Sequence, residues 1–333
     1  MENYNIRINN SNKIRKLFIT KTEDKASEIA KETNLSVMTV NRILKSMLNR
    51  GEVYKSFIHL KIGGRPHNLY SYNYNYIMGL VIYAYKKNDI ISFNSVLLDS
   101  FGRKVTKSIK KLDSISIIDI DKELSFYLKK YPSVKIVSLS LPNLRVSKDK
   151  LRSFILDFPL KDKVKIEKKY KIELNFVSTV NAAAYGIYNK DDSPTNEAYM
   201  AIFSEKNDLK RSGLVINKQI YLTHNNKSGL VNYLEKKEYS SGNILLEQLA
   251  DIIIPSCALF NPKKIIIYGR ALNEELIKLL RFRIGRTFKH SINTSIDYEK
   301  SISIDFLIGI VNFTYDQLKG YYNRKIIKNY ENY

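Results

Sequence analysis

Residues 36 to 50 carry hydrogen-bonding and cationic side chains at helical spacing. Ser36 has the side chain of a helix cap, residues 37–50 follow as a helix, and Gly51 ends it. One face of this predicted helix carries Met38, Thr39, Asn41, Arg42, Lys45 and Ser46, and no acidic residue lies between positions 36 and 51. Hydroxyl, amide and guanidinium groups on one helix face are suited to bind the base edges and phosphates of duplex DNA.

A shorter helix is predicted just before this one, over residues 25–33, with Asp24 as its cap. Asn34 follows at the position of a left-handed turn, a conformation that asparagine tolerates well. The apolar residues of the second helix fall three or four apart, so we expect all of them to pack inward: Val37, Val40, Ile43, Leu44, Met47 and Leu48. This pair of helices predicts a helix-turn-helix, which places its second helix in the major groove.

A hairpin is predicted after the helices. Residues 53–62 and 69–72 have the composition of strands, and Gly63 and Gly64 allow a tight turn between them. Arg65, before Pro66 at the tip, is placed to enter a minor groove or to bind a phosphate. A surface-turn arginine is the alternative for Arg65. Helices and hairpin together predict a winged helix-turn-helix in residues 1–73.

Each polar residue of this region has an expected role. Thr39, Asn41 and Arg42 are expected to read base edges, and Lys25, Lys45 and Lys61 to contact phosphates. The full expected DNA-binding set is Lys25, Ser36, Thr39, Asn41, Arg42, Lys45, Lys61 and Arg65. The alternative is a solvated helix in a small protein-binding module.

Composition narrows the class of protein. The 333 residues suffice for two or three domains, and a net charge of +22 favours polyanionic partners, although an AT-rich coding sequence also enriches lysine. The lone cysteine, Cys257, lies in an apolar stretch and excludes a disulfide scaffold. The four histidines lack metal-ligand spacing, so we expect no metal and no cofactor. Without an apolar leader or a membrane-length apolar run, we expect a cytoplasmic protein that binds no membrane.

After residue 73 one pattern occurs twice. Three strands, a helix and a strand are predicted, and then the same order again, which suggests two similar α/β lobes with a cleft between them. The strands of the first series are expected at residues 77–84, 89–98, 103–109, 134–141 and 172–177, with helices at 115–128 and 180–188. Those of the second series are expected at 198–203, 213–216, 219–222, 264–268 and 301–304, with helices at 243–260 and 273–288 and a closing helix from 306.

Several motifs, in this order and spacing, resemble transcriptional regulators of the ROK family, named for repressors, open reading frames and kinases. They are SVMTVNRILKSMLNRGEV at 36–53, GGRP at 63–66, Gly79 ahead of a strand pair closed by residues 99–102, SLSLPN at 138–143, VNAAAYG at 180–186 and NPKKIIIYG at 261–269. The resemblance implies two actin-like (ribonuclease H-like) lobes behind the winged helix-turn-helix. They would span residues 74–190, closed by the helix at 306–333, and residues 191–305.

The chain departs from the family pattern where the kinases carry out their chemistry. The first phosphate loop resembles residues 79–83, where Val81 and Tyr83 replace the family's Asp and Gly. The catalytic Asn-Asp pair reads Ser178-Thr179, and neither side chain is a general base near neutral pH. The Gly-rich second phosphate loop reads Ser-Glu-Lys-Asn-Asp at 204–208. The sugar-binding Glu, the metal-binding His and the cysteine cluster are missing from residues 229–242.

We therefore expect a transcriptional regulator, a repressor of carbohydrate metabolism, whose body is a pseudokinase and not an enzyme. It is expected to bind a palindromic operator as a homodimer and to take a sugar-like effector. The residues that match the family's cleft, and that can hydrogen-bond a polyol, are Asn143, Ser178, Thr179, Asn181 and Tyr233. Helix capping and turn formation are the alternative roles for them. A protein-interaction scaffold and a residual carbohydrate kinase remain alternative functions.

Overall fold

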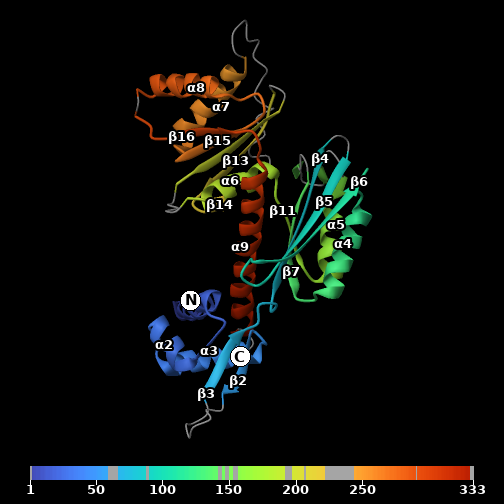
Figure 1. Ribbon diagram of the computed structural model, residues 1–333, viewed down its shortest axis with the longest axis vertical. Helices are drawn as coiled ribbons and strands as arrows, with labels where there is room; N and C mark the ends of the chain where they lie inside the picture. Colours follow the sequence, from blue (N-terminus) through green and yellow to red (C-terminus); the bar gives the residue numbers. More distant parts are fainter. Residues whose placement is uncertain are drawn as a thin grey trace.

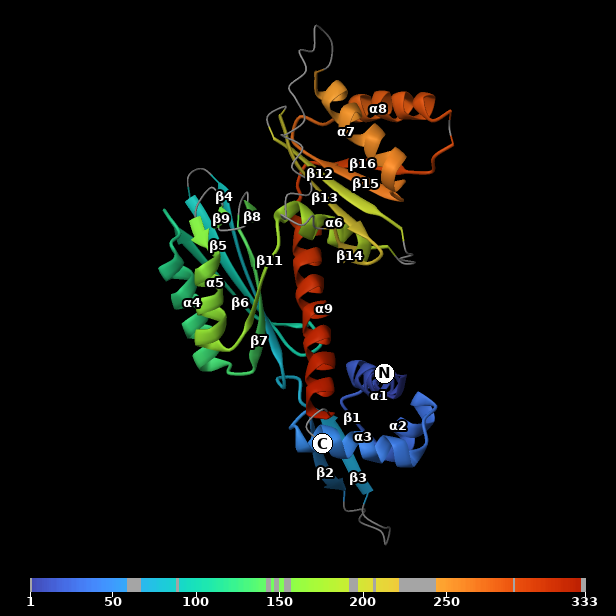
Figure 2. The same cartoon turned by 180° about the vertical axis from the view of Figure 1, so that it is seen from behind.

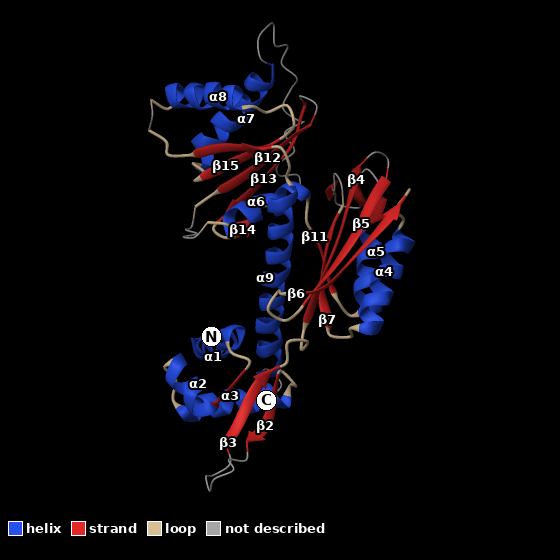
Figure 3. Cartoon of the chain, viewed as in Figure 1, coloured by secondary structure: helices blue, strands red, loops and turns tan. Residues whose placement is uncertain are grey.

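The computed structural model arranges the chain along one long helix (Figure 1). It describes residues 2–58, 67–87, 90–141, 145–146, 150–152, 157–191, 197–205, 208–221, 244–289 and 291–330. Helix α9 (Ser303–Tyr330) forms the axis, with an N-terminal unit at one end and two sheet-based units beside and above it. Figure 2 shows the same arrangement from behind, and Figure 3 distinguishes helices from strands.

The N-terminal unit packs three helices on a small antiparallel sheet, whose strand order is β1-β3-β2. Its helices and strands are α1 (Glu2–Thr20), β1 (Glu23–Lys25), α2 (Ala26–Thr33), α3 (Val37–Asn49), β2 (Val53–Ile58) and β3 (His67–Tyr72). The core of this unit joins buried side chains from all three helices, among them Phe18, Ile29 and Leu44. These contacts fix α3 against the sheet and leave its other face outward.

The start of α2 and the helix before it differ from what the sequence predicted. Asp24 does not cap α2: it lies in β1 opposite Tyr70, and Lys25 occupies the cap position without a side-chain bond. Helix α1 was not predicted, because its first half is rich in asparagine, a poor helix former, and shows no continuous apolar stripe. The helix is stabilised instead by burial of Ile14 and Phe18 in the shared core.

The first sheet of the body has the strand order β11-β7-β4-β5-β6. Strands β4, β5 and β6 are antiparallel neighbours, whereas β7 and β11 run parallel to β4. Its strands and helices are β4 (Met78–Lys87), β5 (Ile90–Leu98), β6 (Lys104–Leu112), α4 (Ile117–Lys130), β7 (Val134–Ser140), α5 (Leu160–Tyr170) and β11 (Glu173–Phe176). Leu80 and Ile82 of β4 face α4 and α5, while Val81 and Tyr83 face α9.

The second sheet has the same arrangement. Written from the corresponding edge, its strand order is β16-β15-β12-β13-β14. Its strands and helices are α6 (Thr179–Asn189), β12 (Tyr199–Glu205), β13 (Asp208–Ile216), β14 (Gln219–Ile220), α7 (Ile244–Phe260), β15 (Lys264–Tyr268), α8 (Glu274–Thr287) and β16 (Ser295–Glu299). Helices α7 and α8 pack on one face of the sheet and α6 on the other. The predicted repetition of three strands, a helix and a strand is therefore confirmed.

Further differences from the predicted elements occur in the body. The fifth strand of the second sheet lies at Ser295–Glu299, whereas the predicted strand at 301–304 runs into the start of α9. A small antiparallel sheet of β8 (Arg145–Val146), β9 (Lys150–Arg152) and β10 (Asp157–Pro159) lies in the lysine-rich stretch, where no strand was predicted. Short strands in a charged segment leave no periodic apolar pattern to detect.

Helices α6 and α9 approach each other closely through small residues. A Cβ atom on Gly309 of α9 would lie 1.6 Å from the carbonyl oxygen of Ala182, and one on Gly186 of α6 would lie 2.0 Å from that of Asp305. Only glycine fits at such separations. The small residues of the VNAAAYG segment are thus explained by helix packing. None of the helices in the described residues combines the length and apolar character needed to cross a membrane.

Candidate functional site

Helix α3 begins as the sequence predicted. Asn34, in the left-handed conformation at φ 53°, ends α2, and the Ser36 hydroxyl then accepts a hydrogen bond from the Thr39 backbone N–H at 3.1 Å. The Ser36 hydroxyl also donates to the Thr39 hydroxyl at 2.9 Å. Both predicted DNA-binding hydroxyls therefore fix the first turn of the helix.

The outward face of α3 is polar and cationic. Asn41, Arg42 and Lys45 are exposed, while Thr39 is half-buried. Val40, Leu44 and Met47 fill the core behind them. Val37 was predicted to pack inward and is instead 49% exposed beside Met38, which is 81% exposed. The first turn of the helix projects beyond the core, so it offers apolar side chains as well as polar ones.

The remaining predicted DNA-binding residues surround this helix or lie outside the described part. Lys25 ends β1 and is half-buried. Lys61 and Arg65 fall in the segment 59–66, outside the described residues. The strands that lead to this segment are paired in register from Val53 with Tyr72 to Ile58 with His67, as a hairpin requires.

A groove of about 280 Å³ lies between α1 and α3. It is lined by Arg7, Asn10, Ser11, Thr39, Arg42, Ile43, Lys45, Ser46, Asn49 and Arg50. The lining thus brings three predicted residues of α3 next to a helix that was not predicted. Because the asparagine-rich sequence of α1 hid the helix, sequence analysis missed Arg7 and Asn10.

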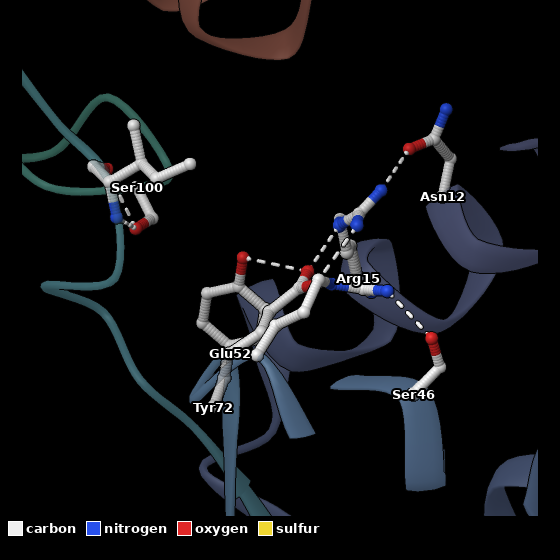
Figure 4. A network of polar contacts seen from close by, with 8 residues as sticks. Asn12, Arg15, Ser46, Glu52, Tyr72 and Ser100 are labelled. Carbon is white, nitrogen blue, oxygen red and sulfur yellow. Dashed lines mark hydrogen bonds and ion pairs between the residues drawn. The ribbon is translucent and has the colours of Figure 1, made fainter. Parts of the chain in front are cut away.

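Glu52 forms the centre of a buried ionic network behind this groove (Figure 4). Arg15 of α1 donates to its carboxylate twice, at 2.5 and 3.2 Å, and Arg50 donates at 2.9 Å. The Tyr72 hydroxyl donates to the same group at 3.3 Å. Burial favours the neutral acid, but the two guanidinium groups prevail and lower the pKa of Glu52 from its ordinary value.

The network also reaches α9. The guanidinium of Arg15 lies 5.1 Å from the centroid of the Tyr322 ring, and Tyr76 stacks on the same ring at 6.0 Å. Burial by itself lowers the pKa of Arg15, but the attraction of and hydrogen bond to Glu52 outweigh it and raise the pKa above its ordinary value, so this residue stays cationic. The N-terminal unit is therefore tied to the end of the helix that runs through the body.

The predicted effector-binding residues of the body are only partly described. Ser178 caps α6 by accepting from the Asn181 N–H at 3.3 Å, Thr179 is half-buried, and Asn181 is 7% exposed. Asn143 and Tyr233 lie outside the described residues. A Cβ on Gly213 would lie 2.3 Å from the carbonyl oxygen of Val180, so β13 crosses the first turn of α6 in backbone contact. Ser178, Thr179 and Asn181 thus lie together at this crossing.

Comparison with solved structures identifies the fold. A ROK family transcriptional regulator, described as a homologue of the E. coli MLC protein, matches with a TM-score of 0.56 and 12% identity over 94% of this chain and 98% of its own. The chain has the fold of the ROK family. A ROK hexokinase from Thermus thermophilus matches with a TM-score of 0.56 and 11% identity, over 73% of this chain and 100% of its own.

A third ROK-fold match is a proposed N-acetylmannosamine kinase from Listeria monocytogenes, with a TM-score of 0.51 and 11% identity over 72% of this chain and 99% of its own. No protein-family model matches the sequence, and no curated protein matches it. The resemblance to the ROK family that the motifs predicted is therefore confirmed by the fold.

The residues that resemble the ROK kinases' first phosphate loop are packed in this chain. Val81 is fully buried against Ala182, Phe306 and Ile310, and β4 continues past it as a regular strand. A Cβ on Gly79 would lie 2.9 Å from a Thr314 methyl group, so this glycine serves the contact with α9. These residues offer neither a carboxylate nor space next to the strand.

The chain's cysteine and the described His, Cys, Asp and Glu side chains were the remaining candidates for a reactive or metal-binding site. Cys257 is buried in α7, and burial raises the pKa of its thiol, which makes the group a poor nucleophile. Within the described ranges, no three His, Cys, Asp or Glu side chains gather in a way that would hold a metal ion. Residues 229–242, where the ROK motif has its zinc ligands, lie outside those ranges.

Proposed function

We propose that this protein is a sequence-specific DNA-binding transcriptional regulator that acts as a repressor. In this proposal residues 1–73 form a winged helix-turn-helix, α3 enters the major groove, and the β2–β3 hairpin is the wing. The observation that carries the proposal is the outward face of α3, where Asn41, Arg42 and Lys45 stand exposed on a capped helix whose other side is buried.

The extent of the structural matches supports the proposal. The transcriptional regulator covers 94% of this chain, whereas the hexokinase covers 73% although its own chain is matched completely. The difference, about a fifth of the chain, equals the length of the N-terminal unit. This difference is the one expected if the regulator has a counterpart for the N-terminal unit and the kinase has none.

The body, in this proposal, consists of two actin-like lobes, residues 74–190 and 191–305, joined by α9. It dimerises the protein and binds a sugar-like effector near Ser178, Thr179 and Asn181. A single winged helix covers a short half-site, so two heads held by a dimer would bind a palindrome with half-sites one or more helical turns apart. Binding of an effector to the body would change the distance between the two winged helices of the dimer, and hence the affinity for the operator.

Phosphoryl transfer is the second candidate, favoured by the fold shared with sugar kinases. It is disfavoured by Val81, which fills the position of the family's carboxylate, and by Thr179, which replaces the catalytic Asp. A coupled assay with ATP and a panel of sugars separates the two functions. Robust turnover with any sugar would overturn the proposal that the kinase-like body is catalytically inactive.

The decisive experiment is selection of bound duplexes from a random pool at near-physiological salt. We expect a palindromic motif, and we expect Arg42→Ala to weaken binding of the selected duplex by about 1–3 kcal/mol and to relax the preference at one base position of each half-site. Lys31→Ala is the control, because this exposed lysine lies on α2 and is not among the residues expected to contact DNA. Recovery of no motif, with binding that only fades as salt rises, would favour the protein-interaction scaffold.

A further inference from the structure

The groove between α1 and α3 has the composition of an anion site. Four of its lining residues are cations, Arg7, Arg42, Lys45 and Arg50, and the others include amide and hydroxyl groups. No carboxylate is among the described residues that line it. The volume of about 280 Å³ admits a phosphate group with part of its neighbouring chain.

Arg50 is held in place at this groove by two contacts. One guanidinium nitrogen donates to Glu52 at 2.9 Å, and another donates to the Ser46 hydroxyl at 2.7 Å (Figure 4). The side chain of Arg50 is only 15% exposed. A guanidinium fixed in this way is preorganised to receive an anion, since little rotamer entropy remains to be lost.

The ionic network next to the groove carries an excess of positive charge. Two guanidinium groups, those of Arg15 and Arg50, share the single carboxylate of Glu52. The side chains of all three are largely or fully buried, so water screens the excess charge weakly. An anion in the groove would balance it.

The position of the groove favours one source of anion. Arg42 and Lys45 belong both to the groove and to the exposed face of α3. A helix in the major groove has the phosphate backbone along its flank, where contacts fix register without reading sequence. Free inorganic phosphate would make the same contacts as a backbone phosphate. A site for free phosphate would not need to lie beside the exposed face of α3, whereas a site for a DNA phosphate would.

We propose that the α1–α3 groove binds a backbone phosphate of duplex DNA, with Arg50 and Arg7 as its ligands and Glu52 as the residue that positions Arg50. This inference rests on the proposed DNA-binding function and adds α1 to the binding surface. The contact is independent of sequence: it sets the depth and angle at which α3 lies against the base edges.

The test compares two changes of identical chemistry at adjacent positions of the full-length protein. Asn10→Asp puts a carboxylate into the groove, whereas Asn9→Asp adds the same charge to an exposed residue outside its lining. Binding to the selected duplex and to an unrelated duplex is measured over a series of salt concentrations. We expect Asn10→Asp to weaken both complexes by the same factor, roughly tenfold or more, and to reduce the salt slope by about one. Asn9→Asp should remain within about twofold of the parent protein.

Arg7→Ala is a second test, because it removes one of the proposed phosphate-binding side chains without adding a negative charge. It should also weaken both duplexes equally and leave the base preference intact, unlike Arg42→Ala. If the parent protein binds its selected duplex and Asn10→Asp and Asn9→Asp bind it equally well, the proposed phosphate site is overturned and the proposed function is not. A parent protein that binds no duplex would overturn the groove and the proposed function together.

Thermal stability in inorganic phosphate, against chloride at matched ionic strength, distinguishes the source of the anion. We expect phosphate to raise the melting temperature of the parent more than that of Asn10→Asp, and duplex binding to weaken in the same variant. A rise confined to the parent, with duplex binding of Asn10→Asp unchanged, would assign the groove to a free anion and overturn the DNA assignment.

Discussion

At the residue scale, Glu52 organises the N-terminal unit. Its carboxylate is fully buried and accepts hydrogen bonds from Arg15 of α1, Arg50 after α3 and Tyr72 of β3. Three elements are thus held by one side chain. Such a group is costly to disturb, because its partners are left charged and buried without compensation.

We expect Glu52→Gln to lower the free energy of unfolding by about 3 kcal/mol at pH 7, since it leaves Arg15 without its buried counter-ion. Because the pKa of Glu52 is lowered in the folded state, its contribution is complete above the ordinary carboxyl pKa of about 4.3 and is lost as pH falls through the folded value. The difference between variant and parent should therefore be constant from pH 6 to 8 and narrow below about pH 4.

Urea unfolding at several pH values checks this prediction. Glu32→Gln serves as the control, because Glu32 makes only a solvent-exposed ion pair with Lys21 and should change stability little. A pH-independent loss in Glu52→Gln would mean that packing, and not charge, accounts for the effect.

At the scale of elements, the contact between α6 and α9 determines how the body is held together. The two helices meet through Ala182, Gly186 and Gly309, where a side chain larger than hydrogen or methyl has no room. Farther along α9, Gly79 and Gly102 approach Thr314 and Tyr315. Helix α9 thus approaches helix α6, strand β4 and the turn at Gly102 closely at glycine positions.

Two glycine-to-alanine changes within α9 should have opposite effects. Gly309→Ala places a Cβ 1.6 Å from a carbonyl oxygen and should destabilise the protein by about 3 kcal/mol or more, because backbone must move. Gly320→Ala meets only the end of the flexible Arg324 side chain at 3.3 Å and should stabilise by about 0.5–1 kcal/mol through helix propensity. Thermal unfolding of both variants measures the contrast, and equal effects would contradict the close approach.

At the scale of the whole molecule, α9 links the second sheet to the N-terminal unit (Figure 1). It begins beside α6, passes the first sheet and meets the N-terminal unit at Tyr322, where Tyr76 and Arg15 pack on the ring. One continuous helix therefore connects the region of the second sheet with the N-terminal unit. In the proposed regulator, this is the physical route from the body to the DNA-binding unit.

We expect Tyr322→Ala to release the N-terminal unit from α9 without unfolding the body. Amide hydrogens of α1 and β3 should exchange faster by roughly tenfold or more, whereas those of β4 and β5 should keep their protection. Hydrogen exchange followed by mass spectrometry measures both. Tyr322→Phe keeps the ring and should behave as the parent. Unchanged exchange in α1 of the alanine variant would show that α9 does not hold the unit.

The elements that sequence predicted correctly are those with local signals. Ser36 as cap, Asn34 as left-handed turn and the polar face of α3 depend on neighbours within a few residues, so spacing and residue type suffice. The repeated strand order was likewise predictable, because each strand has its own alternation or apolar run. That Val81 and Thr179 stand in place of the family's catalytic residues stays a prediction from the motifs.

Tertiary structure alone decided the features that join distant parts of the chain. Arg15 meets Glu52 across 37 positions, and Thr314 meets Ser138 across 176. Helix α1 exists because Ile14 and Phe18 find a core supplied by other elements, which outweighs the weak helix propensity of its asparagines. The sequence determined which residues can cap, pair or bind. Long-range packing determined which of them meet, because that depends on contacts that no local pattern encodes.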